Sequence, residues 1–119
     1  MPSPEALTDM MKATQEMSKE LSSSIPATLN DPDLTLGGAT AMLNVTVRYL
    51  AAIDSIYDAI ESAADNGSLS DDAEEEAADF ADAAHEIGMS LQQAAFERIR
   101  SLGGNANRLL ASAQAEHYS

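Results

Sequence analysis

Apolar residues recur at steps of three and four through the first part of the chain and predict an amphipathic helix. Residues with this spacing share one face of an α-helix, so the row lies along a single side. Ser3 and Pro4 are residue types favoured at the cap and the first position of a helix. Pro26 is expected to end the helix at residue 25, because proline disfavours helical geometry in the residue before it. The row consists of Leu7, Met10, Met11, Thr14, Met17, Leu21 and Ile25.

Residues 26–38 are the least regular stretch and are predicted to form a loop. The pair Gly37-Gly38 would cost about 2 kcal/mol relative to alanine in a helix interior. The next helix is therefore expected to begin near Ala39. With such a loop behind it, the helix over 1–25 is an N-terminal element that either packs on the rest of the domain or detaches from it.

Residues 39–65 carry the strongest helical pattern of the chain. A second apolar row, formed by Met42, Tyr49, Ile56 and Ala63, lies alongside the main row and widens it, which predicts contact with more than one other helix. Asn66 and Gly67 follow, and both tolerate the left-handed conformation that commonly ends a helix. The main row consists of Leu43, Thr46, Leu50, Ile53, Tyr57, Ile60 and Ala64.

A third helix is predicted to begin after Ser70, whose hydroxyl is a favourable N-cap. Gly88 lies inside its apolar pattern and indicates a kink or a close approach of another helix. Gly103 and Gly104 are expected to end it, and a short last helix follows from about Asn105. The apolar positions of the third helix are Ala73, Ala77, Phe80, Ala84, Ile87, Leu91, Ala95 and Leu102.

These elements predict an all-α fold, a small bundle of about four helices. Two long central helices would pack together with an N-terminal amphipathic helix before them and a short C-terminal helix after them. A length of 119 residues suits one domain, and a hydrophobic share of 45% is enough to build a core. No strand-like alternation of apolar and polar residues occurs. The predicted domain therefore spans 1–119.

Composition removes several classes of chemistry. The absence of cysteine excludes disulfides, thiolate zinc sites and a cysteine nucleophile. Asp82 and His85 have the spacing found in di-iron bundles, but such a site needs a second carboxylate–histidine element on a facing helix. No glycine-rich phosphate loop or nucleophile elbow is present. We therefore expect no enzymatic activity, no cofactor and no metal site.

Charge is the most unusual property of the sequence. The formal net charge is −14, and twelve acidic residues without a lysine or arginine lie between Asp54 and Glu86. This segment is either a solvated face that keeps the protein soluble or a surface that attracts a basic partner or imitates a phosphate backbone. Arg98, Arg100 and Arg108 are expected to face the acidic half, within the bundle or on a second copy of the chain.

Two groups of residues are candidates for binding a partner. Methionine thioethers on the first helix make adaptable contact surfaces, although the same side chains could instead fill the core of the bundle. Carboxylates on the third helix are the second group. The candidates are Met10, Met11, Met17 and Leu21 on the first helix, and Asp71, Asp72, Glu75, Asp79, Asp82 and Glu86 on the third.

The sequence predicts a non-enzymatic, acidic helical module that binds a partner through apolar helix faces, as a secretion-system subunit, small chaperone or adaptor does. The alternative is an acidic nucleic-acid mimic that occupies the basic groove of a nucleic-acid-binding protein. In outline, a helix–loop–helix with a central Asp31-Pro32 is similar to small subunits exported by bacterial secretion machines, but no motif specific to them is present and no family is assigned.

The expected partner is another protein or a second copy of the chain, as in a homo-oligomer. Direct nucleic-acid binding is not expected, because the net charge is strongly negative. Membrane binding is not expected either, since about 18 apolar residues never run together and anionic lipids would repel the chain. No basic segment with a following apolar stretch begins the sequence, which predicts a cytoplasmic protein or one exported without a cleaved signal peptide.

Overall fold

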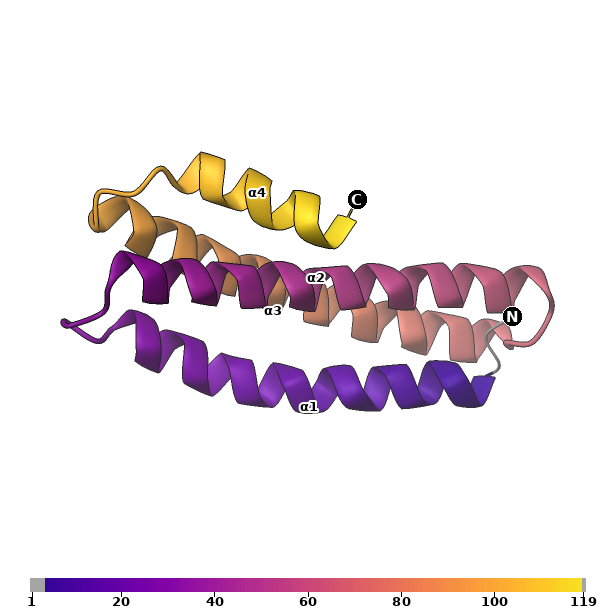
Figure 1. Ribbon diagram of the computed structural model, residues 1–119. Coiled ribbons are helices and arrows are strands. Elements are labelled where there is room, and N and C mark those ends of the chain that lie inside the picture. The colour runs from indigo at the N-terminus through magenta and orange to yellow at the C-terminus, as the bar shows by residue number, and fades with distance from the viewer. Residues whose placement is uncertain (1–3, 119) are drawn as a thin grey trace.

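Four antiparallel helices make up the fold in a computed structural model, which describes residues 4–118 (Figure 1). The second helix turns back along the first, the third along the second, and the fourth returns over one half of the second. No strand occurs within the described range, so the predicted all-α bundle of about four helices is confirmed. The helices are α1 (Pro4–Leu29), α2 (Leu36–Asp65), α3 (Asp71–Ser101) and α4 (Ala106–Tyr118).

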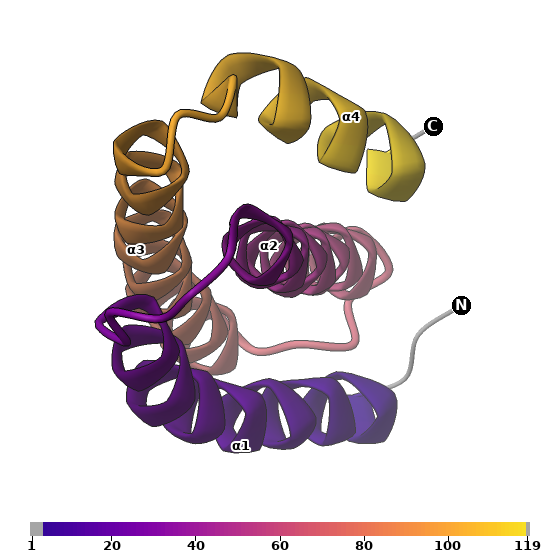
Figure 2. The ribbon, with the colours of Figure 1, turned by 60° about the vertical axis from the view of Figure 1, so that its left-hand side comes forward.

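The central helix is α2, which contacts all three others. Viewed nearly along α2, the helices α1, α3 and α4 lie on three of its sides (Figure 2). Its most extensive contact is with α3, whereas the described parts of α1 and α4 do not touch each other. The wide apolar stripe over 39–65 follows from this central position, because the three other helices cover several sides of α2 (Figure 2).

Among the described residues, α2 is also the one helix long and apolar enough to cross a membrane, judged by length and composition alone. Its most apolar 18-residue window has a mean hydropathy of 1.2, and 39% of that window is buried. The sequence-based argument against such a segment is therefore too strict. The same composition is what the central helix of a bundle requires.

The core forms two clusters along the length of α2. The cluster near the α2–α3 turn joins Tyr49, Ile53 and Ile56 of α2 to small side chains of α3, Ala77 and Ala81 among them. Gly88 extends this small surface, since an added Cβ would lie 2.6 Å from Leu50 Cδ2 and 2.9 Å from Tyr49 Cδ1. The close helix approach expected at Gly88 is confirmed. The cluster at the other end includes Ile25, Leu29, Leu43, Leu91, Ile99 and Ala106.

The predicted end of the first helix at residue 25 is wrong. The helix continues through Pro26 to Leu29, and the Asn30 N–H donates to the Pro26 carbonyl oxygen at 3.0 Å. A proline removes one backbone hydrogen bond, whereas the next turn buries Leu29, which is 6% exposed. Core packing thus outweighs the local proline signal. The expected cap Ser3 lies outside the described residues.

The loop predicted over 26–38 is correspondingly shorter and comprises residues 30–35. Thr35 is the N-cap of α2, and its Oγ1 accepts a hydrogen bond from the Gly38 N–H at 3.1 Å. The two glycines therefore lie in the first turn rather than before the helix. An added Cβ at Gly38 would lie 2.7 Å from Leu34 Cδ1, so a small residue fits this turn.

The other predicted boundaries agree with the structure. Ser70 caps α3 through a hydrogen bond from the Ala73 N–H to its Oγ, at 3.2 Å. Asn66 is the C-cap of α2, and Gly67 follows with φ of +75°. The last helix begins at Ala106, one residue after the expected position. Within α3 one apolar assignment fails, because Ile87 is 37% exposed and Gly88 takes the buried position.

The N-terminal helix packs on the rest of the bundle in this structure. α1 lies against both α2 and α3 along its length. Leu7 and Ile25, near its two ends, are 3% and 1% exposed, and Thr14 between them is 4% exposed. In this structure α1 is therefore a full member of the bundle.

Candidate functional site

The acidic residues between Asp54 and Glu86 gather at the end of the bundle where α2 turns into α3, on the right in Figure 1. The antiparallel pairing of these helices brings the last third of α2 alongside the first half of α3. All of these side chains are exposed except Glu74, which is half-buried. We call this set the acidic end. It comprises Asp54, Asp58, Glu61 and Asp65 of α2 and Asp71, Asp72, Glu74, Glu75, Glu76, Asp79, Asp82 and Glu86 of α3.

Within the acidic end, each helix presents one row of carboxylates. The row on α3 steps by three and four residues from Asp72 to Glu86, and we call it the α3 acid row. The row on α2 runs from Asp54 to Asp65 with the same spacing. Residues with this spacing are neighbours on a helix surface, with Cβ atoms about 5–6 Å apart. The members of the α3 acid row are Asp72, Glu75, Asp79, Asp82 and Glu86.

The density of charge approaches that of duplex DNA. Residues 71–86 span about 24 Å at a rise of about 1.5 Å per residue. The twelve carboxylates of the acidic end share this length, which gives one charge per about 2 Å, against about 1.7 Å for the DNA duplex. The structure therefore brings the acidic candidates of the third helix together with further acids from α2.

Tyr57 links the two helices at this end. Its hydroxyl donates a hydrogen bond to Asp82 Oδ1 across the α2–α3 contact. Partial burial, followed by the hydrogen bond and charge of Asp82 and then the charge of Asp54, raises the pKa of Tyr57 to about 12. Carboxylates from both helices thus act on one phenol, which stays protonated at neutral pH and serves as a donor. Sequence reasoning placed Tyr57 only in the apolar pattern, and nothing local indicated this contact.

Two hollows lie beside the acidic end. The larger, about 340 Å³, runs between α1 and α3, and we call it the α1–α3 groove. The smaller, about 170 Å³, lies between α2, α3 and the end of α4, and its lining includes Asp54, His85 and Met89. The α1–α3 groove is lined by Gln15, Ser18, Lys19 and Ser22 of α1 and by Phe80, Ala83, Ala84 and Ile87 of α3.

The methionine candidates are placed differently from the acidic ones. Met10, Met11, Met17 and Leu21 are half-buried and pack against the core cluster that contains Tyr49. This placement agrees with the alternative role, in which the same side chains fill the core of the bundle, and partner binding by them stays a prediction. The structure thus leaves these side chains little free surface, whereas the acidic candidates are open to solvent.

The arginines do not face the acidic half within the bundle, contrary to expectation. Arg98 and Arg100 lie in the last turn of α3, at the opposite end from Asp71. The Arg98 guanidinium donates to the Asp31 carbonyl oxygen at 3.1 Å and to Ser101 Oγ at 3.2 Å. Arg98 therefore ties the α1–α2 connection to α3. The reason for the difference is the length of α3, which separates its two ends by about 45 Å.

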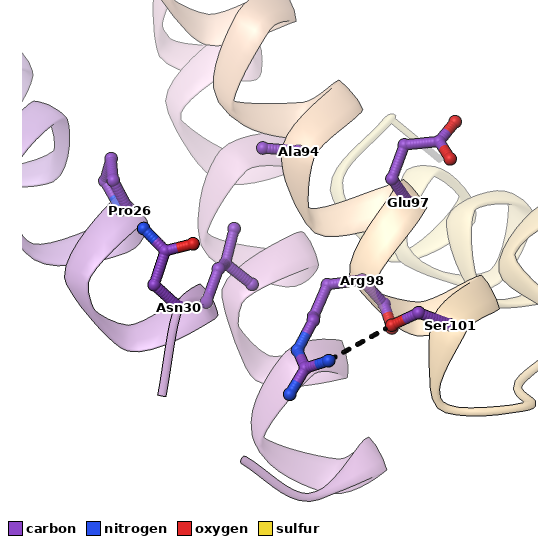
Figure 3. Close-up of a pocket in the computed structure, with 7 residues that line it drawn as sticks. Pro26, Asn30, Ala94, Glu97, Arg98 and Ser101 are labelled. Carbon is purple, nitrogen blue, oxygen red and sulfur yellow. Dashed lines mark hydrogen bonds between the residues drawn. The ribbon is translucent and has the colours of Figure 1, made fainter. Parts of the chain in front are cut away.

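A third hollow, of about 380 Å³, surrounds this arginine (Figure 3). Pro26 and Asn30 of the α1 end face Ala94 and Arg98 of α3 across it. The Glu97 carboxylate points away from the Arg98 guanidinium, which is engaged with Ser101 as the dashed line shows. The Arg98 guanidinium donates its hydrogen bonds to acceptors within the protein, the Asp31 carbonyl oxygen and Ser101 Oγ. The residues around this hollow therefore hold the α1–α2 connection against α3.

Within residues 4–118, no group of three or more histidine, aspartate or glutamate side chains is arranged to hold a metal ion. Asp82 is engaged by Tyr57, and His85 lies beside Met89 and Gln114. Comparison of the chain with protein-family models, curated proteins and solved structures gives no match. The acidic end and the hollows beside it therefore form the candidate site.

Proposed function

We propose that this protein is a non-enzymatic binding module whose acidic end docks on a basic surface of a partner protein. The observation that carries the proposal is the gathering of twelve carboxylates, with no lysine or arginine between them in the sequence, at one end of two adjacent helices. A potential of this sign draws cationic surfaces toward it and fixes how they approach. The apolar faces expected to bind a partner are largely used inside the bundle, which favours the charged surface.

The arrangement is costly to the free protein. Like charges three or four residues apart destabilise a helix by about 0.2–0.5 kcal/mol per pair, and both rows of the acidic end consist of such pairs. A basic partner would neutralise the carboxylates and remove this repulsion. Raising the salt concentration should therefore weaken binding and increase the folding stability of the free protein.

A second candidate function is supported by the charge density. One charge per about 2 Å matches the spacing that nucleic-acid-binding proteins meet on a duplex. The partner would then be a nucleic-acid-binding protein, and the acidic end would occupy its basic groove. Duplex DNA would compete with this chain for such a partner, whereas it would not compete for a partner of the first kind.

The test compares the protein with two variants of equal charge. The first neutralises the α3 acid row to Asn or Gln, and the second makes five matched changes outside the acidic end. Each immobilised form is exposed to an extract of the native host and eluted with rising salt. The control changes are Glu16→Gln, Glu20→Gln, Asp33→Asn, Glu97→Gln and Glu116→Gln.

The proposal expects one basic protein to be retained by the native chain and by the control, released below about 0.5 M salt, and lost from the acid-row variant. Equal retention by both variants would contradict it, because total charge rather than the acidic end would then govern binding. Displacement of the retained protein by duplex DNA would favour the mimic.

A further inference from the structure

The α1–α3 groove combines an apolar lining with the edge of the acidic end. Half-buried Phe80 and exposed Ile87 lie along the α3 side, with the small side chains of Ala83 and Ala84 between them. Ile87 keeps 37% of its surface exposed, so no described segment covers this part of the groove. An exposed isoleucine beside a hollow of about 340 Å³ is apolar surface that the bundle itself does not use.

Carboxylates flank this apolar lining on α3. Asp79 lies four residues before Ala83 and Glu86 three residues after it, so both are neighbours of Ala83 on the helix surface. Both carboxylates are exposed and belong to the α3 acid row. On the α1 side, Lys19 is the cation among the lining residues. A ligand in the groove would therefore meet apolar side chains at its base and negative charge along the α3 edge.

We propose that the α1–α3 groove receives a cationic amphipathic helix of the partner protein. Its apolar side chains lie between Phe80 and Ile87, and its lysines or arginines lie along the α3 acid row. Phe80 and Ile87 are seven residues apart, about 10 Å along α3, which matches apolar anchors spaced over two turns of a bound helix. This inference rests on the proposed function and specifies the chemistry of the partner.

The charge of the surroundings selects this occupant. A neutral apolar ligand would gain nothing from Asp79 and Glu86, which would lose hydration beside it. A second copy of the chain carries the same net charge of −14, so its approach is opposed. A cationic amphipathic helix satisfies both surfaces, with charge setting the encounter and the apolar contact setting the register.

The test uses two synthetic peptides of equal positive charge that form helices. One carries leucines spaced to lie on one face, and its twin has serine in their place. Binding of each peptide to the full chain is measured by fluorescence anisotropy at several salt concentrations. The leucine peptide is expected to bind about 10-fold or more tightly than its twin, because burial of even one leucine contributes that much. Its advantage should persist at about 0.5 M salt, where screening weakens charge contacts.

Variants of the groove separate this proposal from simple charge attraction. Ile87→Ser removes apolar lining and Ala83→Trp fills the groove, and both positions are exposed, so the fold should be kept. Each should reduce the affinity of the leucine peptide to that of its serine twin and leave the twin unchanged. Met89→Ser is the matched control, since Met89 is 46% exposed and lines the other hollow; it should not change either affinity.

Two results would overturn the inference, and they differ in whether they also refute the proposed function. Equal affinity of the two peptides, or no effect of Ile87→Ser and Ala83→Trp, would refute the groove but keep the acidic end as a binding surface. No binding of either peptide at low salt would refute the proposed function as well. Circular dichroism of every variant shows whether the helices are retained.

Discussion

Replacing Gly88 with alanine tests the close contact that joins α2 to α3. The added Cβ would lie 2.6 Å from Leu50 Cδ2 and 2.9 Å from Tyr49 Cδ1. Tyr49 is 0% exposed and its hydroxyl shares a hydrogen bond with Ser18 of α1. The ring therefore has little space to move, and the two helices must separate or repack.

The magnitude follows from two opposing effects. Overpacking of a well-filled core costs about 1–3 kcal/mol, whereas replacing glycine with alanine inside a helix gains about 1 kcal/mol. A net loss of about 1 kcal/mol in the free energy of unfolding is expected for Gly88→Ala. The same substitution at Gly37 is the control, because its nearest atom, Thr35 Oγ1, lies 3.9 Å from the added Cβ. That variant should gain about 0.4–1 kcal/mol.

Urea unfolding followed by circular dichroism measures both variants, with the free energies obtained by linear extrapolation. The difference between the two alanine variants should reach about 1.5 kcal/mol, with the sign reversed between them. If Gly88→Ala were as stabilising as Gly37→Ala, α2 and α3 would not approach each other at Gly88 as described.

Three further predictions concern the cap, the phenol and the charge. Thr35→Ala should cost about 1 kcal/mol in urea unfolding because the Gly38 N–H loses its acceptor, and no loss would contradict the start of α2 at Leu36. Asp82→Asn should lower the pKa of Tyr57 from about 12 toward 10 in an ultraviolet titration. Because the pKa is raised in the folded state, the native contact stabilises the protein below pH 10. This contribution is lost as the pH rises through about 12. Raising salt to about 0.5 M should stabilise the native chain by about 1–2 kcal/mol through screening, and a smaller gain is expected for the acid-row variant than for its matched control.

Helix boundaries that depend on local chemistry could be predicted from the sequence. Ser70 caps α3 through its own hydroxyl, and Asn66-Gly67 ends α2 through its own backbone preference. Pro26 was misjudged because its local effect is opposed by the burial of Leu29 in a core assembled from distant segments. The start of α2 differs from the position expected at Ala39 because Thr35 supplies an N-cap that places both glycines in the first turn.

The candidate site likewise has features that the sequence alone predicts and features that depend on how the helices pack. The spacing of the α3 acid row follows from the sequence alone, since the helix period fixes it. Its alignment with the acids of α2, the bond between Tyr57 and Asp82, and the α1–α3 groove all depend on how helices pair. The exposure of Ile87 is of this kind as well, because its place in the apolar pattern predicts burial, whereas the packing of the helices leaves it 37% exposed.

The acidic end lies at one end of a molecule of 50 × 28 × 16 Å and Arg98, Arg100 and Arg108 lie toward the other, so the negative charge is distributed unevenly along its long axis. In the field of a basic partner such a rod is turned before contact, with the α2–α3 turn foremost. Fewer encounters are then wasted on wrong orientations, and the association rate rises above that of an unsteered pair. The gain resides in the rate of association and declines with ionic strength, whereas the lifetime of the complex is governed by the contacts made after arrival. Under the proposed function, the length of α3 would therefore raise the rate of association as well as build the bundle.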